Sequence, residues 1–405
     1  MGSVGHQRAD DRGDRSGPPP ESEPDAVTSE AHRRPFDLAT LAPNGLRRGR
    51  TTGSCATAAV KAALLLLLRD EVASEVEVSL PDPDYYLLVP VENVARLADG
   101  SVRADVKKYG GDDPDNTDGA TIFARVTVNH QGEVRFLAAE GVGTVTQPGL
   151  RVPPGEAAIN PVPRQMMQMA VDEVLNGAAN PGFDLAIGCV DGEKIAKRTF
   201  NPMLGIVGGI SILGTSGIVE PMSLAAWMAS IEVYIRVALG EQPAAIAFTP
   251  GKIGRRFATD TLALQKKQVV QIANFVGASL DYAQQALEES QARLETLWVL
   301  GHPGKLAKVL DGVWDTHSSK SRMAMHSVAA VAVELGFASG LTQLIEKANT
   351  VENIVEIMRN EPGAQAFWTD IERRLGALMQ PRVSRVDRVA VRLFAMDGTP
   401  LGAAA

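Results

Sequence analysis

Several hydroxyl groups and a thiol stand together at the predicted start of a helix, in Thr51-Thr-Gly-Ser-Cys55, after an arginine-rich stretch that begins at Arg47. Free N–H groups at a helix start and guanidinium groups bind carboxylates and phosphates through charge-assisted hydrogen bonds. The alternative is an ordinary helix capped by Thr52 or Ser54, with the arginines at the surface. Cys55 qualifies as a nucleophile because a helix start lowers a thiol pKa, but we favour a small buried residue there.

A second polar segment, residues 107–119, is dense in carboxylates. When this segment is aligned on an EF-hand loop through Asp113 and Asp115, Gly119 comes one position later than the loop requires. Ala124 stands where the bidentate glutamate is required. The calcium interpretation is therefore excluded. Asp112 or Asp113 remains a candidate base or polar ligand, with simple turn chemistry as the alternative.

Two further loops combine glycine and proline with polar groups, Glu140-Gly-Val-Gly-Thr144 and residues 155–164, and the second ends at Arg164, which is placed to clamp a carboxylate. Later in the chain come His302 and His317. Each can donate to an acid or carry a proton near neutral pH, and a structural hydrogen bond is the alternative. The histidine spacing does not match a zinc site, so no resident metal is expected.

Between residues 184 and 305 the chain repeats a short apolar run, a glycine-bearing turn and the start of a helix. The copies are 185–190 before Asp191, 209–213 before Gly214-Thr-Ser-Gly217, 244–248 before Thr249-Pro-Gly-Lys-Ile-Gly254, and 297–300 before Gly301-His-Pro-Gly-Lys305. Such runs are typical of buried parallel strands, whose carboxyl ends meet at one edge where ligands bind. The pattern predicts an edge for an anionic or nucleotide-like ligand, with mere turn closure as the alternative.

These patterns predict a mixture of α/β and α+β structure in two domains. Residues 1–43 are expected to be a disordered tail, 44–182 a two-layer α+β domain, 183–380 a Rossmann-like three-layer α/β domain, and 381–405 a final strand and tail. Within the first domain we expect two hairpins, 75–80 with 85–91 and 120–128 with 133–138. Asn160-Pro161 predicts a helix start.

The composition narrows the function classes. A net charge of -8 at pH 7 argues against a nucleic-acid binder. Cys55 and Cys189 give no disulfide framework, which favours a reducing, cytoplasmic setting. The aliphatic run 62–68 is too short to span a bilayer and is interpreted as a buried helix, so no membrane partner is expected.

Several motifs, in one order, resemble the cobalt-precorrin-5B (C1)-methyltransferase family of the anaerobic cobalamin pathway. The resemblance runs from about residue 44 to the C-terminus, with Arg50, Tyr109 and Pro303 as departures. It rests on Leu46-Arg-Arg-Gly-Arg-Thr-Thr-Gly-Ser-Cys-Ala56, Gly110-Gly-Asp-Asp-Pro-Asp115, Glu140-Gly-Val-Gly-Thr144, Gly155-Glu-Ala-Ala-Ile-Asn-Pro-Val-Pro-Arg164, Ala196-Lys-Arg-Thr-Phe-Asn-Pro202, Gly208-Gly-Ile-Ser-Ile-Leu-Gly-Thr-Ser-Gly-Ile218, Gly301-His-Pro-Gly-Lys-Leu306 and Thr316-His317.

The resemblance implies methyl transfer from S-adenosylmethionine to ring carbon C1 of cobalt-precorrin-5B, giving cobalt-precorrin-6A, with cobalt only as part of the tetrapyrrole substrate. We expect the first domain to hold the corrinoid and the second to hold the donor. The alternatives are a nicotinamide-dependent reductase, for which no clean Rossmann fingerprint is present, and a non-catalytic corrinoid-binding protein. A homo-oligomer is left open.

The expected site has three parts. Asp112 and Asp113 are the catalytic candidates. The expected substrate-binding residues are Arg50, Thr51, Thr52, Gly53, Ser54, Cys55, Gly143, Thr144, Asn160, Arg164 and Lys197. The expected donor-binding residues are Gly208, Gly209, Gly214, Thr215, Ser216, Gly217, Gly251, Gly301, His302, Gly304, Lys305 and His317.

Overall fold

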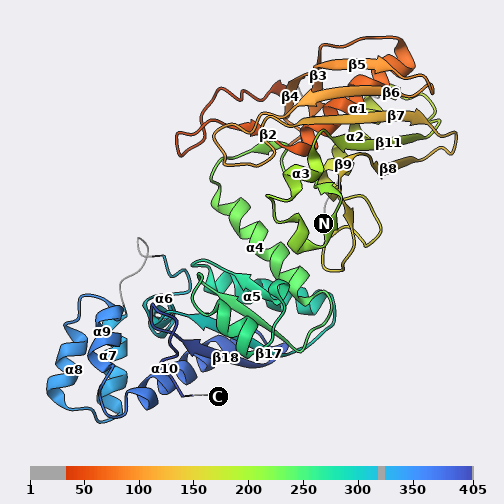
Figure 1. The fold of residues 1–405 in the computed structure, drawn as a ribbon. Helices are drawn as coiled ribbons and strands as arrows, with labels where there is room; N and C mark the ends of the chain where they lie inside the picture. Colours follow the sequence, from red (N-terminus) through yellow and green to blue (C-terminus); the bar gives the residue numbers. More distant parts are fainter. Residues whose placement is uncertain (1–32, 318–323, 404–405) are drawn as a thin grey trace, which may run out of the picture.

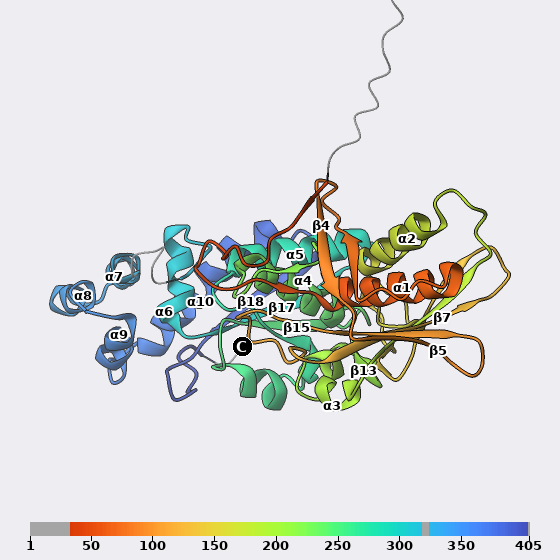
Figure 2. The same cartoon turned by 90° about the horizontal axis from the view of Figure 1, so that it is seen from above.

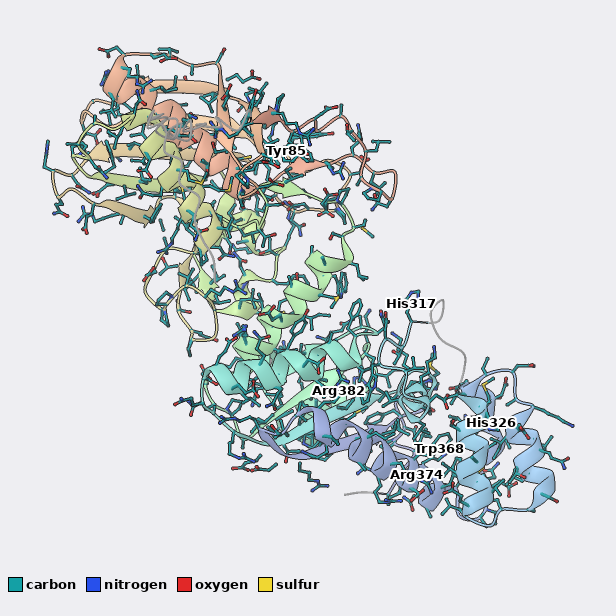
Figure 3. The ribbon with its side chains drawn as sticks, turned by 180° about the vertical axis from the view of Figure 1, so that it is seen from behind. Tyr85, His317, His326, Trp368, Arg374 and Arg382 are labelled. Atoms are coloured by element: carbon teal, nitrogen blue, oxygen red, sulfur yellow. The ribbon has the colours of Figure 1, made fainter. Side chains whose placement is uncertain are left out.

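The computed structural model describes residues 33–317 and 324–403, which form an N-terminal and a C-terminal lobe joined by the helix α4 (Figure 1). Most of the expected tail lies outside the described residues. However, Arg34–Pro35 forms strand β1, which pairs in parallel with β4. The Arg34 guanidinium lies 4.7 Å from the centroid of the Tyr85 ring (Figure 3). The described structure therefore begins before the expected boundary at residue 44.

The main sheet of the N-terminal lobe has the strand order β5-β6-β7-β11-β8. Its strands are β5 (Asn93–Arg96), β6 (Val102–Lys107), β7 (Thr121–Val128), β11 (Phe183–Cys189) and β8 (Val134–Ala138). The strand β11 is antiparallel to β7 and parallel to β8. The predicted hairpin of 120–128 with 133–138 is therefore wrong, because β11 lies between its two strands. For the same reason, β11 does not begin a second domain at residue 183.

Two long helices cover one side of this sheet, while α3 (Gly192–Ala196) and β13 (Gly209–Ile210) lie on the other (Figure 2). Helix α1 (Thr52–Arg69) is capped by the Thr51 side chain, which accepts from the Ser54 N–H, and it ends at Asp70 in the left-handed conformation. Helix α2 (Pro161–Leu175) begins at proline as predicted, but the Asn160 side chain makes no capping hydrogen bond. Among the described helices, α1 alone has the length and apolarity of a membrane span, and 78% of that window is buried, as expected for a core helix.

Smaller sheets complete the N-terminal lobe. The hairpin of β3 (Glu75–Ser79) and β4 (Tyr85–Pro90) is antiparallel and confirms the prediction. Three two-stranded pairs then tie residues 206–219 to the rest of this lobe. They are β10 (Thr144–Val145) with β12 (Ile206–Val207), β9 (Gly141–Val142) with β13 (Gly209–Ile210), and β2 (Gly49–Arg50) with β14 (Ile218–Val219).

The C-terminal lobe contains a parallel sheet of order β16-β15-β17-β18. Its strands are β15 (Ala245–Thr249), β16 (Val269–Gln271), β17 (Leu294–Gly301) and β18 (Val386–Leu393). The last strand is the predicted C-terminal strand, and it joins this sheet. The surrounding helices are α4 (Leu224–Leu239), α5 (Val276–Glu289), α6 (Pro303–Leu306), α7 (Met325–Glu334), α8 (Ser339–Glu346), α9 (Val351–Met358) and α10 (Ala364–Met379).

The two faces of this sheet are covered unequally. Ile246, Phe248 and Val299 belong to a large core with α4, α5 and α10, whereas Ala247 and Leu300 belong to a small cluster beside the π-helical segment Phe257–Thr261. The α/β character is as expected. The predicted Rossmann-like, three-layer organisation is not confirmed.

Helix α4 holds the two lobes together through its second half. There, the Phe200 and Tyr234 rings lie 5.2 Å apart. Gly149 packs so closely on α4 that an added Cβ would lie 2.5 Å from the Arg236 carbonyl oxygen. The start of α4 is instead anchored from outside the helix, by Asp113, which accepts from the Met222 N–H at 2.9 Å.

Candidate functional site

The start of α1 is hydrogen-bonded to segment 211–217. The Thr52 hydroxyl accepts from the Leu213 N–H at 2.9 Å and donates to the Leu213 carbonyl oxygen at 3.2 Å. The Gly53 N–H donates to the same carbonyl oxygen. The Ser54 hydroxyl donates to the Gly217 carbonyl at 2.7 Å, and the Thr51 N–H donates to the same oxygen. These polar groups are therefore satisfied within the protein.

Burial changes what this motif can do. Thr51, Thr52, Ser54 and Cys55 are 6%, 3%, 0% and 0% exposed. Glycine is required on both sides of the contact. An added Cβ at Gly53 would lie 2.8 Å from the Pro163 ring. An added Cβ at Gly214, which has φ +138°, would lie 2.7 Å from the Thr51 side chain. In this conformation the motif holds a loop in place, and that loop exposes Thr215 and Ser216.

The two catalytic candidates are both engaged by neighbouring groups. The Asp112 carboxylate accepts from the Arg47 backbone N–H at 2.8 Å and from its guanidinium at 2.6 Å, and these hydrogen bonds hold the pKa of Asp112 below its usual value. A lower pKa makes Asp112 a weaker base. Asp113 is occupied by the start of α4, and nearby Arg48 pairs with Glu220 at 2.6 Å.

Buried charges lie beneath this region. Lys108, 2% exposed, pairs with Asp115 at 2.6 Å. Burial alone would raise the pKa of Asp115, but the Lys108 ammonium and hydrogen bonds from Lys108 and Thr117 hold it below its ordinary value. Burial raises the pKa of Cys55 to about 11, against the opposing effect of Arg50 and Lys108, so this thiol is not an activated nucleophile. Among the described residues, no group accepts from the buried Nε of Arg50.

The remaining predicted substrate residues are spread over the same lobe. Gly143 and Thr144 lie beside β12, where an added Cβ at Gly143 would meet the Ile206 side chain at 2.4 Å. Arg164 donates to the Ile159 carbonyl at 2.8 Å and pairs with Glu156 at 2.8 Å, so its charge is already partnered. Asn160 stands at the start of α2, and Lys197 is exposed at the end of α3.

The structure divides the predicted donor-binding residues between the lobes. Those at positions 208–217 lie in the N-terminal lobe, where Gly209 packs against Gly141 and Gly214 against Thr51, while Gly208 is exposed. Those at 251–305 lie at the carboxyl ends of β15 and β17, where an added Cβ at Gly301 would lie 3.1 Å from Pro250. His317 follows residues that pair with the segment after β16. The sequence pattern had placed both groups on one sheet edge, and that part of the prediction is wrong.

At the sheet edge, both ring nitrogens of His302 are engaged. Nδ1 accepts from the Gly304 N–H at 3.0 Å, so Nε2 carries the proton and donates to Glu352 of α9 at 2.5 Å. His302 therefore connects this edge to the helical unit α7 to α9. His317 lies exposed at the surface of the C-terminal lobe, on the side of the start of α4 (Figure 3).

Sequence reasoning singled out Lys305 at this edge but missed the two cations that accompany it, Lys252 and Arg256. The exposed residues Lys252 and Arg256 follow β15, and exposed Lys305 follows β17. The described part of the chain gives none of the three an acidic side chain at ion-pair distance. Lys252, Arg256 and Lys305 therefore place positive charge at this edge in a chain whose net charge is -8. Burial, and after it the nearby Lys305 charge, lower the pKa of Lys308 against the opposing effect of Asp315. The signal was present in Lys-Ile-Gly-Arg-Arg directly after a predicted strand.

Comparison with known proteins gives consistent matches along the chain. Residues 39–221 match the family model described as CbiD, and residues 315–405 match CbiD, C-terminal domain. A protein of Ralstonia nicotianae named "Cobalt-precorrin-5B C(1)-methyltransferase" is 80% identical over 372 residues, which cover 92% of this chain and 97% of the relative. A protein of the same name from Chromobacterium violaceum is 72% identical over 92% of this chain and 99% of its own length. The crystal structure of a cobalamin biosynthesis protein (cbiD) from Archaeoglobus fulgidus is 29% identical, with 69% of this chain and 86% of that chain covered and a TM-score of 0.37.

Proposed function

The chain belongs to the cobalt-precorrin-5B C(1)-methyltransferase family, and we propose from this membership that it transfers the methyl group of S-adenosylmethionine to C1 of cobalt-precorrin-5B. As a member of this family, the protein is a methyltransferase of cobalamin biosynthesis. The observation that carries the proposal is the close identity to the Ralstonia protein over nearly the full length of both chains. Neither the reductase nor the carrier alternative has a comparable observation in its favour.

Methyl transfer depends mainly on aligning the donor methyl group with the acceptor carbon. The acceptor carbon supplies the electron pair of the new C–C bond, and the pair of the broken C–S bond stays on sulfur as S-adenosylhomocysteine. Holding the methyl and the acceptor carbon about 3–3.5 Å apart and in line is worth up to roughly 7–11 kcal/mol of the barrier. No strongly basic side chain is needed for this step, which fits the partnered states of Asp112 and Asp113.

We assign these two aspartates a positioning role. Asp113 fixes Met222 just before α4, and Asp112 fixes Arg47 beside β2. Both contacts order the surface between the exposed loop at Thr215 and Ser216 and the start of α4. The donor would contact that loop, where glycine backbone leaves room for a nucleoside and the buried threonines of α1 supply rigidity.

Isotope transfer tests the proposed function. The full-length protein is incubated with cobalt-precorrin-5B and S-adenosylmethionine carrying a labelled methyl group, and the label is located in the product by NMR spectroscopy. We expect label on C1 and an equal amount of S-adenosylhomocysteine. Label on another carbon, or donor turnover without corrinoid product, would contradict the proposal.

A further inference from the structure

The apolar stripe of α4 continues beyond the core that it covers. Ile231 and Ile235 are 1% and 0% exposed in the large core of the C-terminal lobe. Trp227 lies four residues before Ile231, on the same helix face, because residues i and i+4 stand one above the other. Trp227 is nevertheless 56% exposed, and Leu224 is 52% exposed. The same side of the helix is therefore core at one end and open at the other.

The lengths of the elements explain where this open end lies. The short connection 240–244 reverses the chain, so β15 runs back along α4 and its carboxyl end points toward the start of the helix. Helix α4 has 16 residues and spans about 24 Å, whereas the 5 residues of β15 span about 17 Å. The first turns of α4 thus project past the carboxyl edge of the sheet, on the same side as α6 in Figure 1. We call Leu224 and Trp227 the apolar extension.

The carboxyl edge of the same sheet is cationic. The loop after β15 packs against the end of β17, since an added Cβ at Gly254 would lie 2.8 Å from the Leu300 side chain. The segments that follow these two strands carry Lys252, Arg256 and Lys305, which we call the basic edge. Together, the exposed tryptophan and leucine and the exposed cations of this edge would suit a ligand with an apolar body and an anionic rim.

We propose that the corrinoid lies here, with one face of the macrocycle on the apolar extension and its acidic side arms on the basic edge. This inference rests on the proposed function, because it takes the corrinoid to be the acceptor. It also reverses the expectation from sequence, which put the corrinoid on the N-terminal domain. The partnered Arg47, Arg48 and Arg164 of that lobe favour the reversal, because their charges are already matched by carboxylates.

Two probes separate the two halves of the surface. The first is cobyrinic acid, whose side arms are carboxylates, and the second is its methyl ester derivative, whose side arms are uncharged. Affinities are measured by isothermal titration calorimetry on the full chain, with S-adenosylhomocysteine titrated in parallel to report the donor site. One variant, Trp227→Ala, removes the apolar contact. A triple variant, Lys252→Gln, Arg256→Gln and Lys305→Gln, removes the basic edge.

A matched control removes the same charge elsewhere. Lys107, Lys266 and Lys347 are exposed and, within the described structure, make no ion pair, and Lys266 precedes β16 at the opposite end of the sheet. The triple Gln variant of these three lysines should bind both probes as the wild type does. Any loss that it shared with the basic-edge variant would reflect net charge alone.

We expect the basic-edge variant to bind the acid about tenfold to a hundredfold more weakly and the ester unchanged, with the difference shrinking at high salt. Trp227→Ala should weaken both probes by about tenfold. Unchanged acid affinity in both variants overturns the inference, even if the wild type still labels C1. A Trp227→Ala chain that loses a dimer in light scattering but keeps corrinoid affinity would assign the face to a second copy and also overturns it.

Discussion

Replacing Thr52 by valine tests whether the buried motif at the start of α1 holds the loop below it. Valine keeps the shape of threonine but removes the oxygen that accepts from the Leu213 N–H and lies near the Leu213 carbonyl. The part-buried Leu213 amide then lacks a protein partner, at a cost of about 1–3 kcal/mol, and the lost hydrogen bond to a carbonyl adds about 1 kcal/mol. We therefore expect a destabilisation of roughly 2–4 kcal/mol.

The control is Thr57→Val in the same helix. Thr57 is 1% exposed, and its hydroxyl donates only to the Gly53 carbonyl of the preceding turn, so valine leaves no N–H group without a partner. Its cost should stay near 1 kcal/mol or below. Urea unfolding followed by circular dichroism gives the global change. Hydrogen exchange of peptides over 209–217 gives the local change, with each 1.4 kcal/mol accelerating exchange about tenfold.

The comparison of the two variants shows whether Thr52 holds the loop 209–217 in place. The account requires faster exchange in 209–217 for Thr52→Val and near wild-type exchange there for Thr57→Val. Weaker binding of S-adenosylhomocysteine should accompany the first variant alone, because the proposed donor loop is then less ordered. Equal effects of both substitutions would refute the reasoning that Thr52 holds this loop.

Three further outcomes follow from buried groups and close contacts. Burial raises the pKa of Glu372 to about 7, above its usual 4.5, so the folded state binds the proton more tightly than the unfolded chain does. The free energy of unfolding should therefore fall as pH rises from about 4.5 to 7. Glu372→Gln should flatten this part of a plot of urea midpoint against pH. Burial raises the pKa of Cys55 and of Cys189 to about 11, so neither thiol should react with Ellman's reagent at pH 8 until the chain unfolds, and rapid reaction in the native state would contradict this. Gly49→Ala would place a Cβ 2.3 Å from the Gly110 carbonyl carbon and should lower the melting temperature far more than Gly340→Ala, whose added Cβ meets nothing within 4 Å; equal shifts would count against the close approach.

Local patterns in the sequence predicted local structure well. Proline after Asn160 marked the start of α2, alternation marked the hairpin of β3 and β4, and apolar runs marked β15 and β17. Each of these features is encoded within a few neighbouring residues. The insertion of β11 between β7 and β8 was not predictable in this way, because pairing partners far apart in sequence leave no short-range signal.

The same limit applies at the candidate site. The hydroxyls of Thr51, Thr52 and Ser54 were visible in the sequence, but their partners at 211–217 were not, so the burial of these groups and their hydrogen bonds within the protein could not be predicted. Conversely, the sequence analysis singled out nothing at the start of α4, and only the folded lengths of α4 and β15 reveal that Trp227 projects past the sheet.

The most direct test of the whole account is a structure of the protein with both S-adenosylhomocysteine and a corrinoid bound. The account predicts the donor sulfur at the Thr215 and Ser216 loop, the macrocycle on Trp227 with its carboxylates at Lys252, Arg256 and Lys305, and C1 facing the sulfur. Two ligands seated in separate sites, with C1 turned away from the sulfur, would contradict it.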